Sequence, residues 1–263
     1  MENPSEHCWI SRCDRVKKAL EANGFEVFLA ERADDAASIV LGTIIPGVRA
    51  VEPHGQEAAA PVVRRNPSKF QSSFDKASDD TRIPPPPGDH DFLRRRVKVA
   101  WGGSKTFRDT GLYRAVKREP GLECLDPFAR GVSLDQSMDL RRKALLSDLF
   151  ITGTNAVTET GRLVNLDRTG NRVAAISFGP KWVAILAGRN KIVPDLVDAV
   201  RRVKTYAAPL VTMWLGAKTP CARTGICQEC SAPERVCNTW SILEKSYPRG
   251  RVKVILINED LGF

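Results

Sequence analysis

Residues 97–106 read Val-Lys-Val-Ala-Trp-Gly-Gly-Ser-Lys-Thr, and this stretch decides the fold class. The β-branched run at 97–101 predicts a strand, because short apolar runs bounded by glycine are typical of strands in a covered sheet. The two glycines predict a turn, and 106–117 has the pattern of a helix. A strand, a glycine turn and a helix in direct succession are characteristic of an α/β protein.

The same alternation continues on both sides of this stretch. Further helices are predicted over 13–23, 34–41 and 133–147, and from Pro194 onward. Gly24 and Pro46-Gly47 are the expected stops of the first two, while Ser133 and Gln136 form a capping box for the third. Further strands are predicted over 25–30, 149–152, 162–166, 173–177, 182–187 and 252–257. We therefore expect a mostly parallel sheet with helices on both faces, and ligands beyond the carboxyl ends of the strands.

Length and composition allow one sizeable α/β domain or two small ones, since the chain has 263 residues of which 42% are hydrophobic. Residues 51–96 lack this periodicity and contain four consecutive prolines and three consecutive arginines. We interpret them as a polar, exposed or disordered insertion, with a docking segment for an acidic partner as the alternative. The expected parts are thus an N-terminal helix-strand-helix part at 1–50, the insertion, the main α/β domain at 97–217 and a cysteine-rich segment with the last strand at 218–263.

The formal net charge is +9 and the isoelectric point is near 9.3. The cations are spread along the chain among acidic residues, which argues against sequence-specific nucleic-acid binding and suits a small anionic metabolite or an acidic redox partner. The sequence has no apolar run of the roughly 20 residues that a membrane-spanning helix needs. The first residues do not have the pattern of a signal peptide, so we expect a cytoplasmic protein without membrane insertion.

Cysteine usage gives the strongest chemical signal. Seven cysteines without a secretion signal predict reduced thiols, and four of them form a C-x5-C-x2-C-x6-C segment: Cys221, Cys227, Cys230 and Cys237. A capping box of Ser231 and Glu234 predicts a helix that carries the fourth thiol, so that all four could converge on one centre. Thiolates alone suit an iron-sulfur cluster of the 4Fe-4S type or a closed zinc site, and the spacing does not decide between them.

The alternative for these four residues is that they are buried apolar side chains. Gln228, Glu229 and Arg235 make that segment too polar for a core, so we favour the metal site. Cys8, Cys13 and Cys124 are isolated in the sequence, and for them a structural role is favoured.

Two loops are candidates for ligand binding. Gly102, Gly103, Ser104, Lys105 and Thr106 follow the first predicted strand, and Thr152, Gly153, Thr154 and Asn155 follow another. Free backbone N–H groups and small polar side chains at such positions can bind an anion, although a simple turn would use the same residues. Glu159 is the candidate general base or nucleophile, with an exposed turn residue as the alternative. We expect both loops to border one cleft.

The residues of these motifs resemble the LUD (lactate utilisation) domain family. The resemblance rests on Trp101–Ser104, on 147–161 (Ser-Asp-Leu-Phe-Ile-Thr-Gly-Thr-Asn-Ala through Glu-Thr-Gly), on Asn171–Val173 and Phe178–Pro180, on Asn190–Val193, and on the closing Asn-Glu-Asp-Leu-Gly at 258–262. The cysteine segment is similar to a small, stand-alone, cysteine-bearing branch of that family. The insertion at 51–96 departs from the family pattern.

The resemblance implies a fold like that of the ribose-phosphate isomerase and CoA-transferase group. It also implies a link to the oxidation of lactate by iron-sulfur proteins encoded together, and hence iron-sulfur partner subunits. It brings no catalytic residue with it, and fold likeness alone does not establish function. The leading hypothesis is a redox-associated protein of hydroxy-acid use; the alternatives are a non-redox isomerase-like or transferase-like enzyme with structural zinc, and an assembly subunit without turnover.

Overall fold

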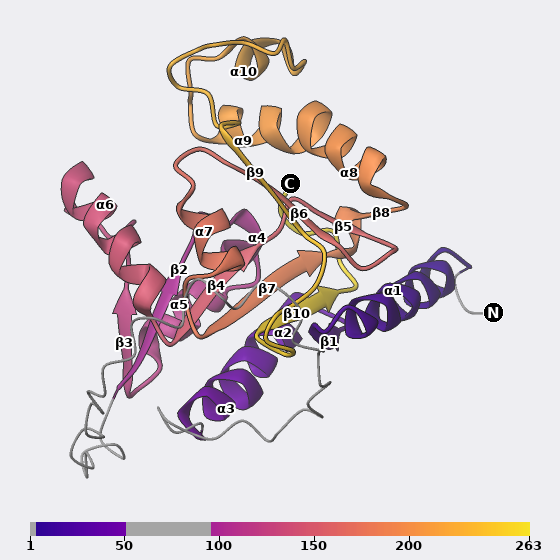
Figure 1. The fold of residues 1–263 in the computed structure, drawn as a ribbon, viewed down its shortest axis with the longest axis vertical. Helices are drawn as coiled ribbons and strands as arrows, with labels where there is room; N and C mark the ends of the chain where they lie inside the picture. Colours follow the sequence, from indigo (N-terminus) through magenta and orange to yellow (C-terminus); the bar gives the residue numbers. More distant parts are fainter. Residues whose placement is uncertain (1–3, 51–95) are drawn as a thin grey trace, which may run out of the picture. The chain divides into compact units, whose positions relative to one another are not determined.

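The computed structural model describes residues 4–50 and 96–263, so the predicted insertion, apart from Arg96, lies outside the described residues. The described chain is an α/β protein, as the sequence predicts. Its main sheet has six strands, all parallel, in the order β1-β10-β7-β4-β2-β3 (Figure 1). These are β1 (Glu26–Ala30), β10 (Val252–Ile257), β7 (Trp182–Gly188), β4 (Leu149–Gly153), β2 (Val97–Trp101) and β3 (Leu122–Leu125).

The main sheet is buried on both faces, because successive residues of its strands point into two different apolar clusters. In β10, Val252, Val254 and Leu256 belong to one cluster, and Ile255 and Ile257 belong to the other. This alternation of side chains along a strand explains why the central strands are almost wholly apolar.

Helices from different parts of the chain complete the two clusters. The first cluster includes residues of α1 (Pro4–Ala22) and α7 (Asn171–Ser177). The second includes residues of α2 (Ala33–Ile39), the π-helix η1 (Val40–Ile44), α3 (Ile45–Ala50), α4 (Lys105–Asp109) and α5 (Leu112–Arg118). Between β3 and β4 lie α6 (Leu134–Lys143) and the short 3-10 helix η3 (Ala144–Leu146).

A second, mixed sheet of four strands has the order β8-β5-β6-β9. Its strands are β8 (Ile192–Val193), β5 (Ala156–Thr158), β6 (Leu163–Asp167) and β9 (Thr239–Leu243). The 3-10 helix η4 (Arg189–Lys191) leads from β7 into this sheet. The sheet packs against α8 (Leu196–Arg202), which continues through the π-helix η5 (Val203–Ala207) into α9 (Ala208–Trp214); the short α10 (Pro220–Thr224) lies against α9 (Figure 1).

The structure corrects three local predictions. Residues 173–177 form part of helix α7 and not a strand, because their buried positions, such as Val173 and Ile176, recur at three-residue spacing. Pro46-Gly47 does not end a helix, since the π turn of η1 places Pro46 in the first turn of α3, where proline is tolerated. No helix follows Ser231, and the carboxylate of Glu234 accepts a hydrogen bond from the backbone N–H of Lys218, 2.8 Å away.

Other predictions agree with the structure. The strand at 97–101 and the last strand at 252–257 have the predicted bounds, and Ser133 and Gln136 form the predicted capping box of α6. The first helix is longer than predicted and begins at Pro4. Within the described ranges, no helix has the length and apolar character needed to cross a membrane.

Gly161 allows α1 to pack closely on the turn between β5 and β6. Its φ is +81°, and a Cβ there would lie 2.6 Å from the backbone carbonyl carbon of Ala19. We expect Gly161→Ala to lower the free energy of unfolding by about 3 kcal/mol, because it combines a left-handed backbone with a steric clash. Denaturant unfolding will measure the change.

Gly47→Ala is the matched control, since Gly47 is helical and, among the described residues beyond its own helix, no atom lies within 4 Å of its would-be Cβ. It should change stability by no more than about 1 kcal/mol, in the stabilising direction, because alanine has the higher helix propensity. Equal effects of the two substitutions would show that the packing at Gly161 is unimportant.

Candidate functional site

The two predicted loops meet at one cleft beyond the carboxyl ends of β2 and β4. Gly102–Thr106 and Gly153–Asn155 are among its lining residues, and its volume is about 730 Å³, within the range of ligand sites. Gly153 permits the close approach of the loops, because a Cβ at this position would lie 2.7 Å from Oγ of Ser104. Thr152 is fully buried and is not among the residues that line the cleft.

Several polar groups of these loops have structural partners. Ser104 caps α4 by accepting a hydrogen bond from the backbone N–H of Phe107 at 3.2 Å. Lys105 forms an ion pair with Asp109 at 2.6 Å. The hydroxyl of Thr154 lies 3.2 Å from the backbone oxygens of Ala156 and Val164. The anion-binding role predicted for these loops therefore depends on the other side chains that line the cleft, in particular the basic ones.

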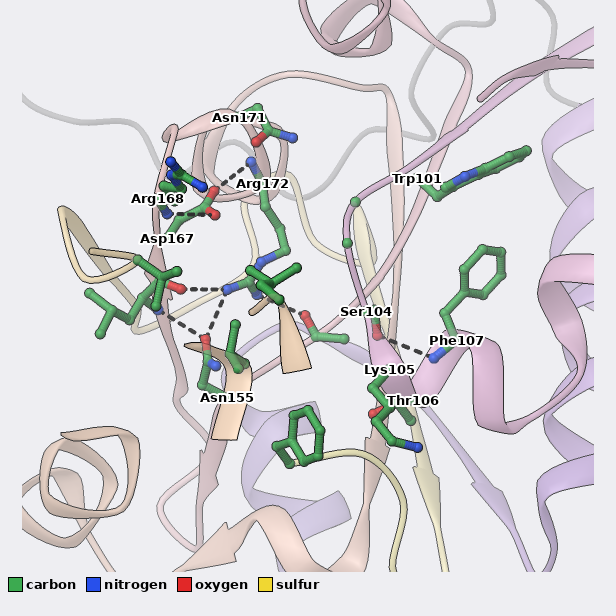
Figure 2. Close-up of a pocket in the computed structure, with 18 of the residues that line it drawn as sticks. Trp101, Ser104, Lys105, Thr106, Phe107, Asn155, Asp167, Arg168, Asn171 and Arg172 are labelled. Atoms are coloured by element: carbon green, nitrogen blue, oxygen red, sulfur yellow. Dashed lines mark hydrogen bonds between the residues drawn. The ribbon is translucent and has the colours of Figure 1, made fainter. Parts of the chain in front are cut away.

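Arg172 is the most extensively bonded side chain of the cleft. It reaches from α7 toward Asn155, across from Ser104 and Thr106 (Figure 2). Its guanidinium donates to the backbone oxygens of Gly153 (3.1 Å) and Leu166 (2.7 Å) and to the side-chain oxygens of Asn165 (2.7 Å) and Asn155 (2.8 Å).

All four of these acceptors are neutral. Burial lowers the pKa of Arg172, and the nearby Asp167 opposes that effect. The carboxylate of Asp167 accepts a hydrogen bond from the backbone N–H of Arg172 at 2.9 Å, whereas the guanidinium donates to other groups. The positive charge is thus held inside the protein by dipoles.

Lys191 is a second buried cation of the cleft, with 4% of its surface exposed. Its Nζ donates to Oγ1 of Thr106 at 2.7 Å and to the backbone oxygen of Thr154 at 3.0 Å, so it bridges the two loops. Burial, with added repulsion from Arg202 and Arg172, lowers the pKa of Lys191 to about 7.

The cleft is strongly cationic. Its basic lining residues are Lys105, Arg108, Arg141, Arg168, Arg172 and Lys191. Among the described residues that line it, Asp167 is the only one with an acidic side chain. In Arg141 the Nε atom is buried and has no hydrogen-bond partner in the described part of the chain. Cations that lack full compensation attract an anion, and this attraction is strong where water is excluded.

Aromatic rings form much of the remaining wall. Arg141 stacks over Phe128 with its Cζ 5.3 Å from the ring centre, and the rings of Trp214 and Phe263 lie 6.2 Å apart. The cleft therefore offers both apolar contacts and positive charge, a combination that suits an organic anion.

Glu159 lies apart from this group. Its carboxylate pairs with Nε of Arg12 at 2.7 Å, linking α1 to the turn after β5, and it is not among the residues that line the cleft. Glu159 thus has a structural partner outside the cleft lining, and its catalytic role stays a prediction.

The four cysteines of the predicted metal site line one small cavity. Cys221, Cys227, Cys230 and Cys237 all border this cavity, whose volume is about 90 Å³. Without the predicted helix after Ser231, irregular backbone carries the last three thiols, while Cys221 is in α10. In the described chain, no three His, Cys, Asp or Glu side chains are grouped as ligands of one metal ion. The sulfurs thus surround a space and are not drawn together at one point.

Two of the sulfurs, those of Cys221 and Cys237, have polar hydrogen-bond partners. Nε of Arg235 donates to Sγ of Cys237 at 3.2 Å, and the hydroxyls of Thr219 and Thr212 lie 3.3 and 3.4 Å from Sγ of Cys221. The hydrogen bond to Cys237, with the electrostatic attraction of that side chain, raises the pKa of Arg235. Donors of this kind around cysteine sulfur are those that stabilise thiolate ligands of an iron-sulfur cluster or zinc ion. The donor set therefore fits a thiolate-bound centre.

The cleft and the cysteine cavity share part of their walls. Leu166, Ala208 and Val236 line both. The two spaces are therefore neighbours that have these three apolar residues in common. Arg172 and Lys191 were missed by the sequence reasoning, although both lie in the segments that resemble the family, because neither is part of a recognisable charge pattern.

Similarity to known proteins identifies the family of this chain. No curated protein matches the chain. A solved structure, described as the crystal structure of a DUF162 family protein from Deinococcus radiodurans, covers 95% of this chain and 98% of its own, with 13% sequence identity and a TM-score of 0.43. The family profile of the LUD domain matches residues 13–257. The chain therefore belongs to the LUD domain family.

Proposed function

We propose that this protein acts in the utilisation of lactate or a related hydroxy acid, with a small carboxylate anion bound in the cationic cleft and an iron-sulfur cluster held by Cys221, Cys227, Cys230 and Cys237. Membership of the LUD domain family supports the general role. The observation that carries the specific proposal is the shared wall, because it makes the proposed anion site and the four-thiol cavity neighbours.

The cleft side of the proposal rests on charge. Carboxylates form strong, charge-assisted hydrogen bonds with guanidinium groups, and the unpartnered Nε of Arg141 offers such a donor. The cleft is larger than a three-carbon acid requires, so lactate should be compared with longer hydroxy acids of the same charge.

The cysteine side rests on the donor set. A cluster bound there would supply one-electron transfer. The chain itself would hold the four cysteine sulfurs around one cavity and form hydrogen bonds with two of them. The apolar side chains of the shared wall would exclude water from the cluster. The net positive charge of the protein suits an acidic redox partner, which we include in the proposal as an iron-sulfur partner subunit.

Metal content tests the cysteine side. Protein purified without oxygen should be brown, with broad absorption at the border of the visible and ultraviolet, and should contain about four iron and four sulfide per chain. Cys230→Ser should lose colour and iron, while the control Cys8→Ser should keep both, because Cys8 is an exposed residue of α1 outside the cavity. One zinc per chain and no colour would replace the redox proposal with a structural zinc site.

Ligand affinity tests the cleft side. Arg141→Gln should weaken the binding of lactate or a longer hydroxy acid by roughly tenfold or more, since a hydrogen bond to a charged group contributes about 1.5–3 kcal/mol. Titration calorimetry at two salt concentrations will measure it. Arg142→Gln is the matched control, because Arg142 is the next residue of α6, is 70% exposed and pairs with Asp139. Equal affinities in the two variants would contradict the assignment of the anion to this cleft.

A further inference from the structure

Lys191 is a buried lining residue of the cleft for which the proposed function has no role. It comes from η4, between β7 and β8, and its Nζ lies where the loops after β2 and β4 meet. A Cβ at Gly153 would lie 3.6 Å from Nζ of Lys191, so the absence of a side chain at Gly153 leaves space around the amine.

Nζ donates to two neutral oxygens, and no carboxylate in the described part of the chain forms an ion pair with it. Three charged groups act on it from the neighbouring elements: Arg172 on α7, Arg202 on α8 and Asp109 at the end of α4. Asp109 itself is paired with Lys105. The two arginines and burial favour the uncharged amine, and Asp109 opposes them.

An uncharged amine with two N–H bonds fixed has one lone pair left. In Lys191 the bonds to Thr106 and Thr154 account for two hydrogens, so the lone pair can face the cleft that the residue lines. A buried lysine of this kind, next to other cations, is a nucleophile toward carbonyl carbon.

We propose that Lys191 is a nucleophile that forms an imine with a 2-oxo acid bound in the cleft. The lone pair of Nζ attacks the carbonyl carbon and forms a C–N bond, while the carbonyl oxygen takes up a proton to give a carbinolamine. The oxygen then leaves as water and a C=N bond remains; the two hydrogens of the amine and the carbonyl oxygen make up that water. No oxidant or reductant is needed.

The proposed function supplies the choice of ligand, since a 2-oxo acid is the oxidised form of a 2-hydroxy acid, and this inference rests on it to that extent. The carboxylate of the ligand would be drawn by the arginines of the cleft, which leaves its carbonyl group near the amine. The same amine would not react with the hydroxy acid, which has no carbonyl carbon next to the carboxylate. Lys191 thus distinguishes the two oxidation states of the ligand.

Reductive trapping tests the inference. The full-length protein is incubated with pyruvate and cyanoborohydride, which reduces an imine to a stable amine, and the modified lysine is identified by peptide mass spectrometry. We expect one adduct, at Lys191, with a yield that rises with pH around 7, because the uncharged fraction of the amine grows through that range. Lys191→Met should abolish it, and Lys143→Met, at the exposed end of α6, should not.

The outcomes separate this inference from the proposed function. Pyruvate binding that depends on Arg141 without an adduct at Lys191 would overturn the inference and leave the proposed function standing. Absence of binding by both lactate and pyruvate would overturn the proposed function. Labelling spread over exposed lysines would overturn the inference too. Because mapping of the wild-type protein locates the adduct directly, the test does not depend on whether Lys191→Met folds.

Discussion

The guanidinium of Arg172 is the contact on which the geometry of the site depends. It ties the end of β4, the residue before β5 and two residues of β6 to helix α7 through four hydrogen bonds. A buried charge is costly unless its hydrogen bonds are satisfied, and here dipoles satisfy it without neutralising it. The same arrangement therefore joins the two sheets and leaves positive potential at their junction. Lys191 ties the two loops together through its hydrogen bonds to Thr106 and Thr154, while the arginines of the cleft supply the charge that attracts anions.

The cysteine cavity is held together mainly by side-chain contacts and not by regular secondary structure. Its thiols come from a short helix and from irregular backbone, so regular secondary structure does not fix most of their positions. Side-chain contacts do this instead: Arg235 bonds the sulfur and backbone oxygen of Cys237 and the backbone oxygen of Cys230. Such an arrangement suits a metal or iron-sulfur centre whose binding to the four cysteines would itself help to order the loop that carries them.

The sequence predicted the parts of this protein that local patterns determine. Apolar runs at 97–101 and 252–257 gave two strands with the bounds found in the structure, because both faces of the main sheet are covered. In the second sheet, β5 and β8 were missed because three and two residues are too few to show a period, and β9 was missed because it is largely exposed and is not an apolar run. Helix α7 was misread as a strand because its apolar residues are closely spaced. That the two loops border one cleft could be predicted, because both follow parallel strands of one sheet. The positions of Arg172 and Lys191 could not, because they depend on contacts between segments far apart in the sequence.

The wall formed by Leu166, Ala208 and Val236 also constrains how this protein can evolve. Each of the three side chains has one surface toward the cleft and another toward the cysteine cavity. A larger residue in place of Ala208 would reduce the volume of both the cleft and the cysteine cavity. A change that suits one of the two spaces therefore also alters the other. A relative without the four cysteines would be subject only to the constraint from the cleft. Across the family, the identities of these three residues should therefore vary together with the presence or absence of the cysteine segment.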